Sequence, residues 1–119
     1  MYAAMRFTLE KGRSIPAPQF MTRGGFRRFR LRAAGFVAGP PMPPTGVYGT
    51  TGVGPDLYTA AQDATRAMID HLAGTYDLSR EDAYVLSSLC VDLRISEIVD
   101  AGQYVVSALL PLGIFLDHR

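Results

Sequence analysis

Residues 50–100 decide the fold of this chain, and they read TTGVGPDLYTAAQDATRAMIDHLAGTYDLSREDAYVLSSLCVDLRISEIVD. The spacing of apolar residues in this stretch changes from three and four to two near residue 91, which predicts two helices followed by a strand. Each of these elements has one apolar face that another element must cover. We therefore expect the flanking segments to be arranged around residues 50–100.

The first helix is expected to start at Pro55, because a proline at the first helical position loses no hydrogen bond. Asp56 adds negative charge near the positive end of the helix dipole. Gly74 is expected to end the helix in a left-handed conformation. The apolar stripe of this helix comprises Leu57, Ala61, Ala64, Met68 and Leu72. Its solvated side comprises Thr59, Asp63, Arg66 and Asp70.

The second helix is expected to start after Ser79, whose hydroxyl can accept a hydrogen bond from the amide of Asp82. Its buried face comprises Ala83, Leu86 and Cys90, with Val85 and Leu89 beside it. From Val91 the pattern alternates as in a strand, with Leu93 and Ile95 on one face and Asp92, Arg94 and Ser96 on the other. A bulge or strand end is expected at residues 97–99, followed by a turn at residues 100–102.

Further strands are expected on both flanks. Residues 5–10 alternate apolar and polar side chains, which predicts a half-buried strand that ends at Lys11-Gly12. A short strand is expected at residues 20–22, and a β-rich run at residues 103–110 should end at Pro111. Together these patterns predict an α+β fold, in which two antiparallel-type helices pack on a small mixed or antiparallel sheet.

The composition is that of one folded domain, with 119 residues of which 48% are hydrophobic and 19% are charged. Residues 1–44 carry eight arginines or lysines and one acidic residue, whereas residues 45–119 carry four arginines and ten acidic residues. These two parts of opposite charge could attract each other or a neighbouring polypeptide. A single cysteine, Cys90, cannot form an intrachain disulfide, which favours a reducing cytoplasm. Neither a signal peptide nor an apolar run of roughly 18 residues is found, so no membrane partner is expected.

Five arginines between Arg23 and Arg32 raise the question of nucleic-acid binding, because guanidinium groups neutralise phosphates. Only Phe26 and Phe29 are interleaved with them, and no RNA-binding signature surrounds them. We therefore expect a solvated edge strand and no nucleic-acid partner. Residues 35–46 contain four prolines and three glycines, which predicts a linker or a surface loop.

The other reactive side chains form no recognisable catalytic motif. His71 and His118 lack a second histidine or cysteine at ligand spacing, so no metal site is expected in this chain. A nucleophilic pair of Cys90 and His71 is disfavoured, because the cysteine falls on an apolar face. The glycines of residues 50–56 precede a helix, but their spacing differs from that of phosphate-binding loops.

Asp92, Arg94 and Ser96 form a polar constellation that is a candidate substrate-binding site. They project from one strand face at a spacing of two, so Asp92 and Arg94 can pair and position a polar substrate. The same pair could instead brace the sheet without binding anything, as paired surface charges commonly do. Both interpretations stay open at this point.

Two runs resemble one known family. YGTTGVGPDLYTAAQDATRAMIDHLAG begins at Tyr48, and LSREDAYVLSSLCVDLRISEIVDAGQYVVSALLPLGIF ends at Phe115. Together they resemble the C-terminal part of the acetamidase/formamidase family, hydrolases that release ammonia from small linear amides. Residues 5–22 also resemble a strand segment of that family, whereas residues 23–47 show no resemblance.

The resemblance implies an α+β region docked on β-sandwich subdomains, and a divalent metal centre in a longer N-terminal region with a histidine and a GDGE-like motif. This sequence lacks that motif, so no catalytic residue and no cofactor are expected in this chain. We expect the C-terminal part of an amidase, inactive alone, whose partner is the N-terminal half of the same enzyme or a complementary chain, with a homo-oligomer possible. The alternative is a free-standing α+β binding module without catalysis. N-terminal strands are assigned to residues 1–34, the loop to residues 35–46 and the amidase-like region to residues 47–119.

Overall fold

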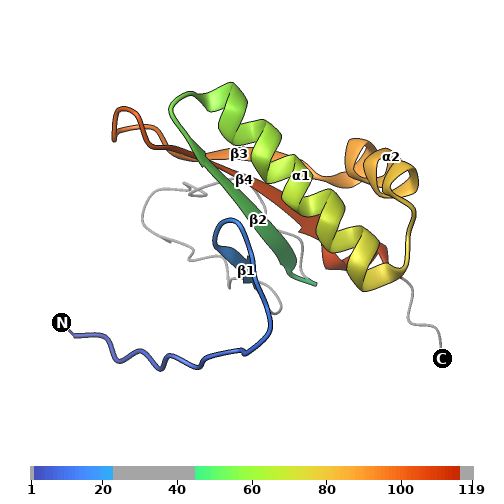
Figure 1. Ribbon diagram of the computed structural model, residues 1–119, viewed down its shortest axis with the longest axis horizontal. Coiled ribbons are helices and arrows are strands. Elements are labelled where there is room, and N and C mark those ends of the chain that lie inside the picture. Colours follow the sequence, from blue (N-terminus) through green and yellow to red (C-terminus); the bar gives the residue numbers. More distant parts are fainter. Residues whose placement is uncertain (1, 23–44, 116–119) are drawn as a thin grey trace, which may run out of the picture.

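The computed structural model describes residues 2–22 and 45–115, which form an α+β fold (Figure 1). Its four-stranded sheet is antiparallel, with the strand order β1-β2-β4-β3. The elements in chain order are β1 (Gln19–Met21), β2 (Val47–Gly54), α1 (Leu57–Tyr76), α2 (Arg80–Cys90), β3 (Asp92–Glu97), β4 (Tyr104–Pro111) and the short 3-10 helix η1 (Leu112–Ile114). The predicted α+β class, with two helices on a small sheet, is confirmed.

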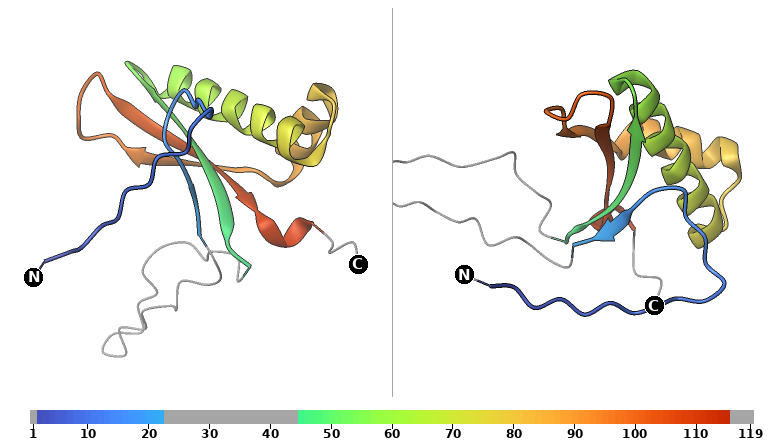
Figure 2. Two further views of the ribbon diagram at one scale, coloured as in Figure 1. Left: turned by 60° about the horizontal axis from the view of Figure 1, so that its bottom comes forward. Right: turned by 60° about the vertical axis from the view of Figure 1, so that its left-hand side comes forward.

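The core lies between α1 and the sheet. Helix α1 runs along one face of the sheet over β2 and β4, and α2 packs beside the C-terminal part of α1 (Figures 1 and 2). Met68 and Leu72 of α1 and Leu110 of β4 are fully buried in this layer. Burying one such side chain stabilises the fold by about 1.5–3 kcal/mol. The contact between α1 and the sheet therefore supplies much of the stability.

Gly52 allows α1 to approach β2 closely. A Cβ atom at Gly52 would lie 1.9 Å from the carbonyl oxygen of Ala60 and 2.7 Å from the amide nitrogen of Ala64. Beside it, the Oγ1 of Thr50 is buried and donates a hydrogen bond to the carbonyl oxygen of Ala64 at 2.7 Å. This part of the glycine-rich stretch therefore serves helix–sheet packing.

The start of α1 differs from the prediction by two residues. Asp56 is the N-cap, and its Oδ1 accepts a hydrogen bond from the amide of Thr59 at 2.8 Å. Pro55 consequently lies before the helix and not at its first position. The bond from the Thr59 amide is the main cause that lowers the pKa of Asp56, so this carboxylate satisfies a helix amide that would otherwise lack a partner.

The prediction that Gly74 ends the helix is wrong. Helix α1 continues to Tyr76, and Asp77 takes the left-handed conformation with a φ of 55°. Tyr76 stacks on Phe115, with ring centroids 3.9 Å apart and planes 7° from parallel. This tertiary contact favours the additional residues, although a glycine inside a helix costs about 1 kcal/mol relative to alanine.

Helix α2 begins after Ser79 as predicted, and the Ser79 Oγ accepts from the amide of Asp82 at 3.1 Å. Val85 and Leu89 are exposed, although we expected them beside the buried face. The reason is that α2 packs on α1 along one narrow side only. That side comprises the buried Ala83 and Ser87 and the partly buried Leu86 and Cys90.

Strand β3 forms an edge of the sheet and pairs with β4. Its register shifts between Ile95 and Glu97, which confirms an irregularity close to the predicted position. The turn that follows is also confirmed, because the amide of Gln103 donates to the carbonyl oxygen of Asp100 at 3.1 Å and Gly102 has a φ of 87°. Pro111 is the last residue of β4, as expected.

The N-terminal segment departs from the prediction. Residues 5–10 are exposed and belong to no strand, because no described element covers them (Figures 1 and 2). The short strand expected at residues 20–22 is present as β1. The arginine-rich strand expected between residues 23 and 32 and most of the loop at residues 35–46 lie outside the described residues.

In the part of the chain that the structure describes, neither helix combines the length and the apolar character needed to cross a membrane.

Candidate functional site

Asp92, Arg94 and Ser96 lie together on β3, as their spacing predicts. Arg94 Nε donates to Asp92 Oδ2 at 2.9 Å, and the guanidinium side chain is only 28% exposed. Ser96 Oγ lies 2.6 Å from the Oγ of Ser107 on β4. Because Arg94 is opposite Ser107, while the neighbouring Ala108 packs toward α1, this group lies on the sheet face away from the helices. The contact between Ser96 and Ser107 joins β3 to β4, and the role of Asp92, Arg94 and Ser96 toward a substrate stays a prediction.

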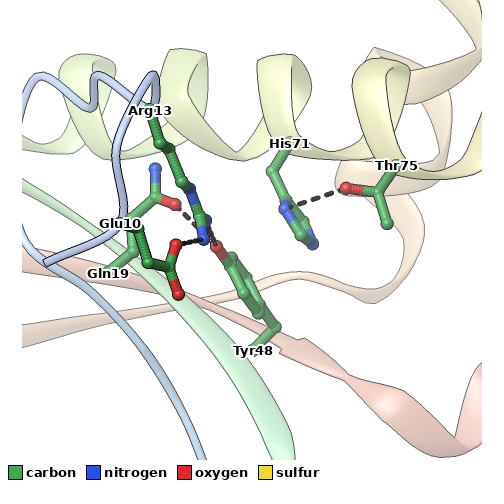
Figure 3. Close-up of polar contacts among 6 residues, drawn as sticks. All are labelled: Glu10, Arg13, Gln19, Tyr48, His71 and Thr75. Carbon is green, nitrogen blue, oxygen red and sulfur yellow. Dashed lines mark hydrogen bonds and ion pairs between the residues drawn. The ribbon is translucent and has the colours of Figure 1, made fainter. Parts of the chain in front are cut away.

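A second polar group, which we call the Tyr48 cluster, joins three separate parts of the chain (Figure 3). It comprises Glu10, Arg13, Gln19, Tyr48 and His71. Tyr48 Oη donates to Gln19 Oε1 at 2.6 Å and accepts from Arg13 Nη2 at 3.4 Å. Arg13 Nη1 also donates to Glu10 Oε2 at 3.0 Å. The cluster thus ties the N-terminal segment to β1 and β2.

Aromatic rings connect the Tyr48 cluster to the core. The rings of Tyr48 and His71 stack with centroids 3.6 Å apart and planes 4° from parallel. His71 meets Tyr76 edge-on at 6.2 Å, and Tyr76 in turn stacks on Phe115. Stacked and edge-on aromatic pairs each contribute about 0.5–1.5 kcal/mol beyond their burial. These ring contacts hold the C-terminal half of α1 against β2 and against Phe115, which follows η1.

The electrostatics of the Tyr48 cluster favour a neutral imidazole. Burial, and then the charge of Arg13, lower the pKa of His71. Its Nδ1 lies 3.3 Å from the Oγ1 of Thr75, within hydrogen-bond distance. A neutral imidazole can both donate and accept a hydrogen bond, so His71 can serve as an acceptor near neutral pH.

A cleft of about 430 Å³ adjoins the Tyr48 cluster. Its polar part comprises Thr8, Glu10, Arg13, Gln19 and Tyr48, and its apolar part comprises Ile15, Phe20 and Met21. The volume of the cleft falls within the usual range for ligand pockets.

Sequence reasoning missed the Tyr48 cluster. It treated His71 as an isolated residue, because no partner for it occurs at a fixed spacing along the chain. Tyr48 comes from β2, His71 from α1 and Arg13 from a segment without regular structure. The packing of α1 on β2 brings His71 to Tyr48, and the pairing of β1 with β2 brings the segment with Arg13 to the same place.

Cys90 is not arranged as a nucleophile. Its Sγ donates to the carbonyl oxygen of Leu86 at 3.0 Å, whereas His71 contacts Tyr48 and Thr75. Burial raises the pKa of the Cys90 thiol, which disfavours the reactive thiolate. The sequence-based argument against a Cys–His pair agrees with this geometry.

The divalent metal implied by the family resemblance does not fit the side chains described. Within residues 2–22 and 45–115, no three side chains of histidine, cysteine, aspartate or glutamate come together as a set that could hold a metal ion. The His71 ring stacks on Tyr48, and its Nδ1 lies 3.3 Å from the Oγ1 of Thr75. The chemistry of the Tyr48 cluster is therefore that of hydrogen bonding.

Lowering the pH should destabilise the chain more when His71 is present than when glutamine replaces it. The pKa of His71 is lower in the folded chain than the ordinary value of 6.5, so the unfolded chain binds this proton more readily. The free energy of unfolding contributed by this group therefore falls as the pH falls through 6.5. Denaturant unfolding of the chain and of His71→Gln between about pH 7.5 and about pH 5 measures the difference. Equal losses in the two proteins would contradict it.

Comparison with known proteins identifies the family. The sequence profile of the Acetamidase/Formamidase family matches residues 23–117. The match includes residues 23–47, where the sequence showed no resemblance, and stops short of residues 5–22, where we saw one. No curated protein matches the chain at a significant level. Because the profile match covers well over half of the sequence, the chain belongs to the acetamidase/formamidase family.

Proposed function

We propose that this chain forms the C-terminal part of an amide hydrolase, which converts a small linear amide and water into a carboxylate and ammonia. It acts together with a further polypeptide part that supplies the divalent metal and the catalytic residues. Membership of the acetamidase/formamidase family supports the reaction class. The cleft beside Tyr48 supports a small polar substrate, because polar side chains line part of it.

The observation that carries the proposal of a larger assembly is the apolar side of β3, which no described helix or strand covers. Leu93 lies opposite Ala108 and Ile95 opposite Val106, so both face the side of the sheet that packs on α1. They are nevertheless 49% and 57% exposed, because α1 covers β2 and β4 instead. Adjacent exposed apolar residues of this kind are typical of a contact with another polypeptide. A free-standing binding module would be expected to cover them itself.

Hydrolysis of an unactivated amide needs a polarised water molecule and a proton for the leaving amine. We assign both tasks to the metal-binding part. The contribution of this chain is to provide one wall of the site and to hold the substrate. Asp92, Arg94 and Ser96 are candidates for that wall, because they form a fixed polar group on one sheet face. The Tyr48 cluster is a second candidate.

The isolated chain should release no ammonia from formamide or acetamide with any added divalent metal. Mixing it with the separately purified N-terminal half of a full-length family protein should restore ammonia release, and a chelator should abolish it. Each half alone serves as a control. Chelator-sensitive turnover by this chain alone would contradict the assembly, and a mixture that forms a complex without turnover would contradict the amidase assignment.

A matched pair of variants tests the surface that supports the assembly. Ile95→Asp should lower the restored rate at subsaturating concentrations by about tenfold or more, since burying a charge without a partner costs several kcal/mol. Val85→Asp on α2 should change the rate by less than about twofold, although Val85 is also 55% exposed, because it lies away from β3. Equal effects of the two substitutions would count against a contact at β3.

A further inference from the structure

The N-terminal segment has the side-chain pattern of a strand, but no described strand pairs with it. Met5, Phe7 and Leu9 alternate with Arg6 and Thr8, which places three large apolar side chains on one side of an extended chain. All three are strongly exposed, and Leu9 remains 80% accessible. Residues 2–10 are paired in no strand, and they run outside the helices and the sheet (Figures 1 and 2).

The segment is anchored where it meets the sheet. Thr51 Oγ1 donates to the carbonyl oxygen of Pro18 at 2.6 Å, just before β1 begins. Nearer the segment, Arg13 contacts both Glu10 and Tyr48. A turn at residues 11 and 12, where Gly12 has a φ of 78°, follows residues 4–10, and Arg13 holds Glu10 across this turn. The segment therefore extends from a fixed base, and its backbone pairs with no strand of the described residues.

The residues between this segment and β1 also make it unfavourable for residues 4–10 to join the sheet of this chain as a further strand. Pro16 and Pro18 lie between the segment and β1, and a proline has no amide hydrogen to donate to a neighbouring strand. β1 itself has only three residues, so it offers a short edge. Among the described residues, the sheet edge next to this segment is therefore only as long as β1.

We propose that residues 4–10 add as a strand to the open edge of an antiparallel sheet in the metal-binding part of the amide hydrolase. This inference rests on the proposed function. Main-chain hydrogen bonds supply affinity in such a contact, and pockets for alternate side chains supply specificity. The partner edge presents an apolar side that takes Met5, Phe7 and Leu9.

Charge specifies the partner further. Within residues 2–22, Arg6, Lys11 and Arg13 are opposed by Glu10 alone, so the segment carries a net positive charge. An acidic surface beside the partner edge complements it and increases the rate of association. The partner is thus a sheet edge with an apolar side and acidic flanks.

A binding experiment with a matched control tests the proposal. The full chain and its variants are titrated with the separately purified N-terminal half of a full-length family protein, and the Kd is measured by calorimetry. Leu9→Asp should weaken binding by at least about tenfold, because burial of one leucine is worth more than a tenfold change in affinity. Leu89→Asp should leave the Kd within about twofold, although Leu89 is equally exposed at 81%.

A second variant separates backbone pairing from apolar contact. Thr8→Pro removes one amide donor and leaves the apolar side intact, so it should weaken binding by at least about tenfold. Hydrogen exchange should show protection of amides in residues 4–10 only in the complex. Thermal unfolding of each variant alone should match that of the unaltered chain, because the substituted side chains are exposed.

The outcomes distinguish this inference from the proposed function. If the N-terminal half binds Leu9→Asp and Thr8→Pro as tightly as it binds the unaltered chain, the proposed strand pairing is wrong, even if the complex hydrolyses amides. A complex that depends on residues 4–10 and releases no ammonia supports the strand and overturns the amidase assignment. Absence of a complex, or pairing of residues 4–10 only between two copies of this chain, overturns the inference.

Discussion

Gly52→Ala should destabilise the chain by about 1–3 kcal/mol or more, because the added methyl group has no space. Its Cβ would lie 1.9 Å from the carbonyl oxygen of Ala60, which belongs to the backbone of α1 and cannot rotate away. Accommodating it requires α1 to move off β2, which also lengthens the hydrogen bond from Thr50 to Ala64. The midpoint of urea unfolding, followed by circular dichroism, measures the loss.

Gly74→Ala is the matched control for Gly52→Ala. Gly74 lies on the exposed side of α1, and a Cβ at this position meets no atom within 4 Å. Alanine is favoured over glycine inside a helix by about 1 kcal/mol, so this variant should be more stable than the unaltered chain. Opposite signs for the two glycine substitutions are the expected result. A stable Gly52→Ala protein would show that α1 does not pack on β2 as described.

Met68→Ala should cost about 2–5 kcal/mol, which is the usual range for truncating a fully buried side chain. Met68 is one of the largest fully buried residues, and it lies between α1 and the sheet together with Leu72 and Leu110. The loss combines the apolar surface that is no longer buried with the cavity that remains. For a chain of this size, a loss in that range is a large fraction of the total stability.

Leu89→Ala provides the comparison for Met68→Ala. Leu89 belongs to α2, and because most of its surface is exposed its truncation should change the free energy of unfolding by less than about 0.5 kcal/mol. A much larger loss of stability for Met68→Ala than for Leu89→Ala would show that Met68 belongs to the core and Leu89 does not. If Leu89→Ala proved as costly as Met68→Ala in the isolated chain, the packing of α2 would have to be reassigned.

Most of the elements were predictable, because their signals are local. The capping by Ser79 and the alternation that begins after Val91 involve residues within a few positions of one another, and both are confirmed. The close pairing of Asp92 with Arg94 follows in the same way from a spacing of two on one strand face. Such patterns require no knowledge of the remaining chain.

The candidate site was only partly predictable. Tyr48, His71 and Arg13 are separated along the chain, so no spacing rule could join them. Their contact depends on the register of β2 and on the position of α1 over it. The end of α1 beyond Gly74 has a similar origin, because Tyr76 finds a stacking partner in Phe115.

The order of the elements from α1 to β4, the cap at Ser79 and the apolar side of β3 were determined locally, by backbone geometry and side-chain periodicity. Which apolar sides are covered was settled by long-range packing. Leu93, Ile95 and the segment at residues 4–10 have the pattern of buried strands, yet α1 covers only the two central strands of the sheet. Periodicity shows which side of an element avoids water, but the element that covers it must be brought there by the rest of the fold.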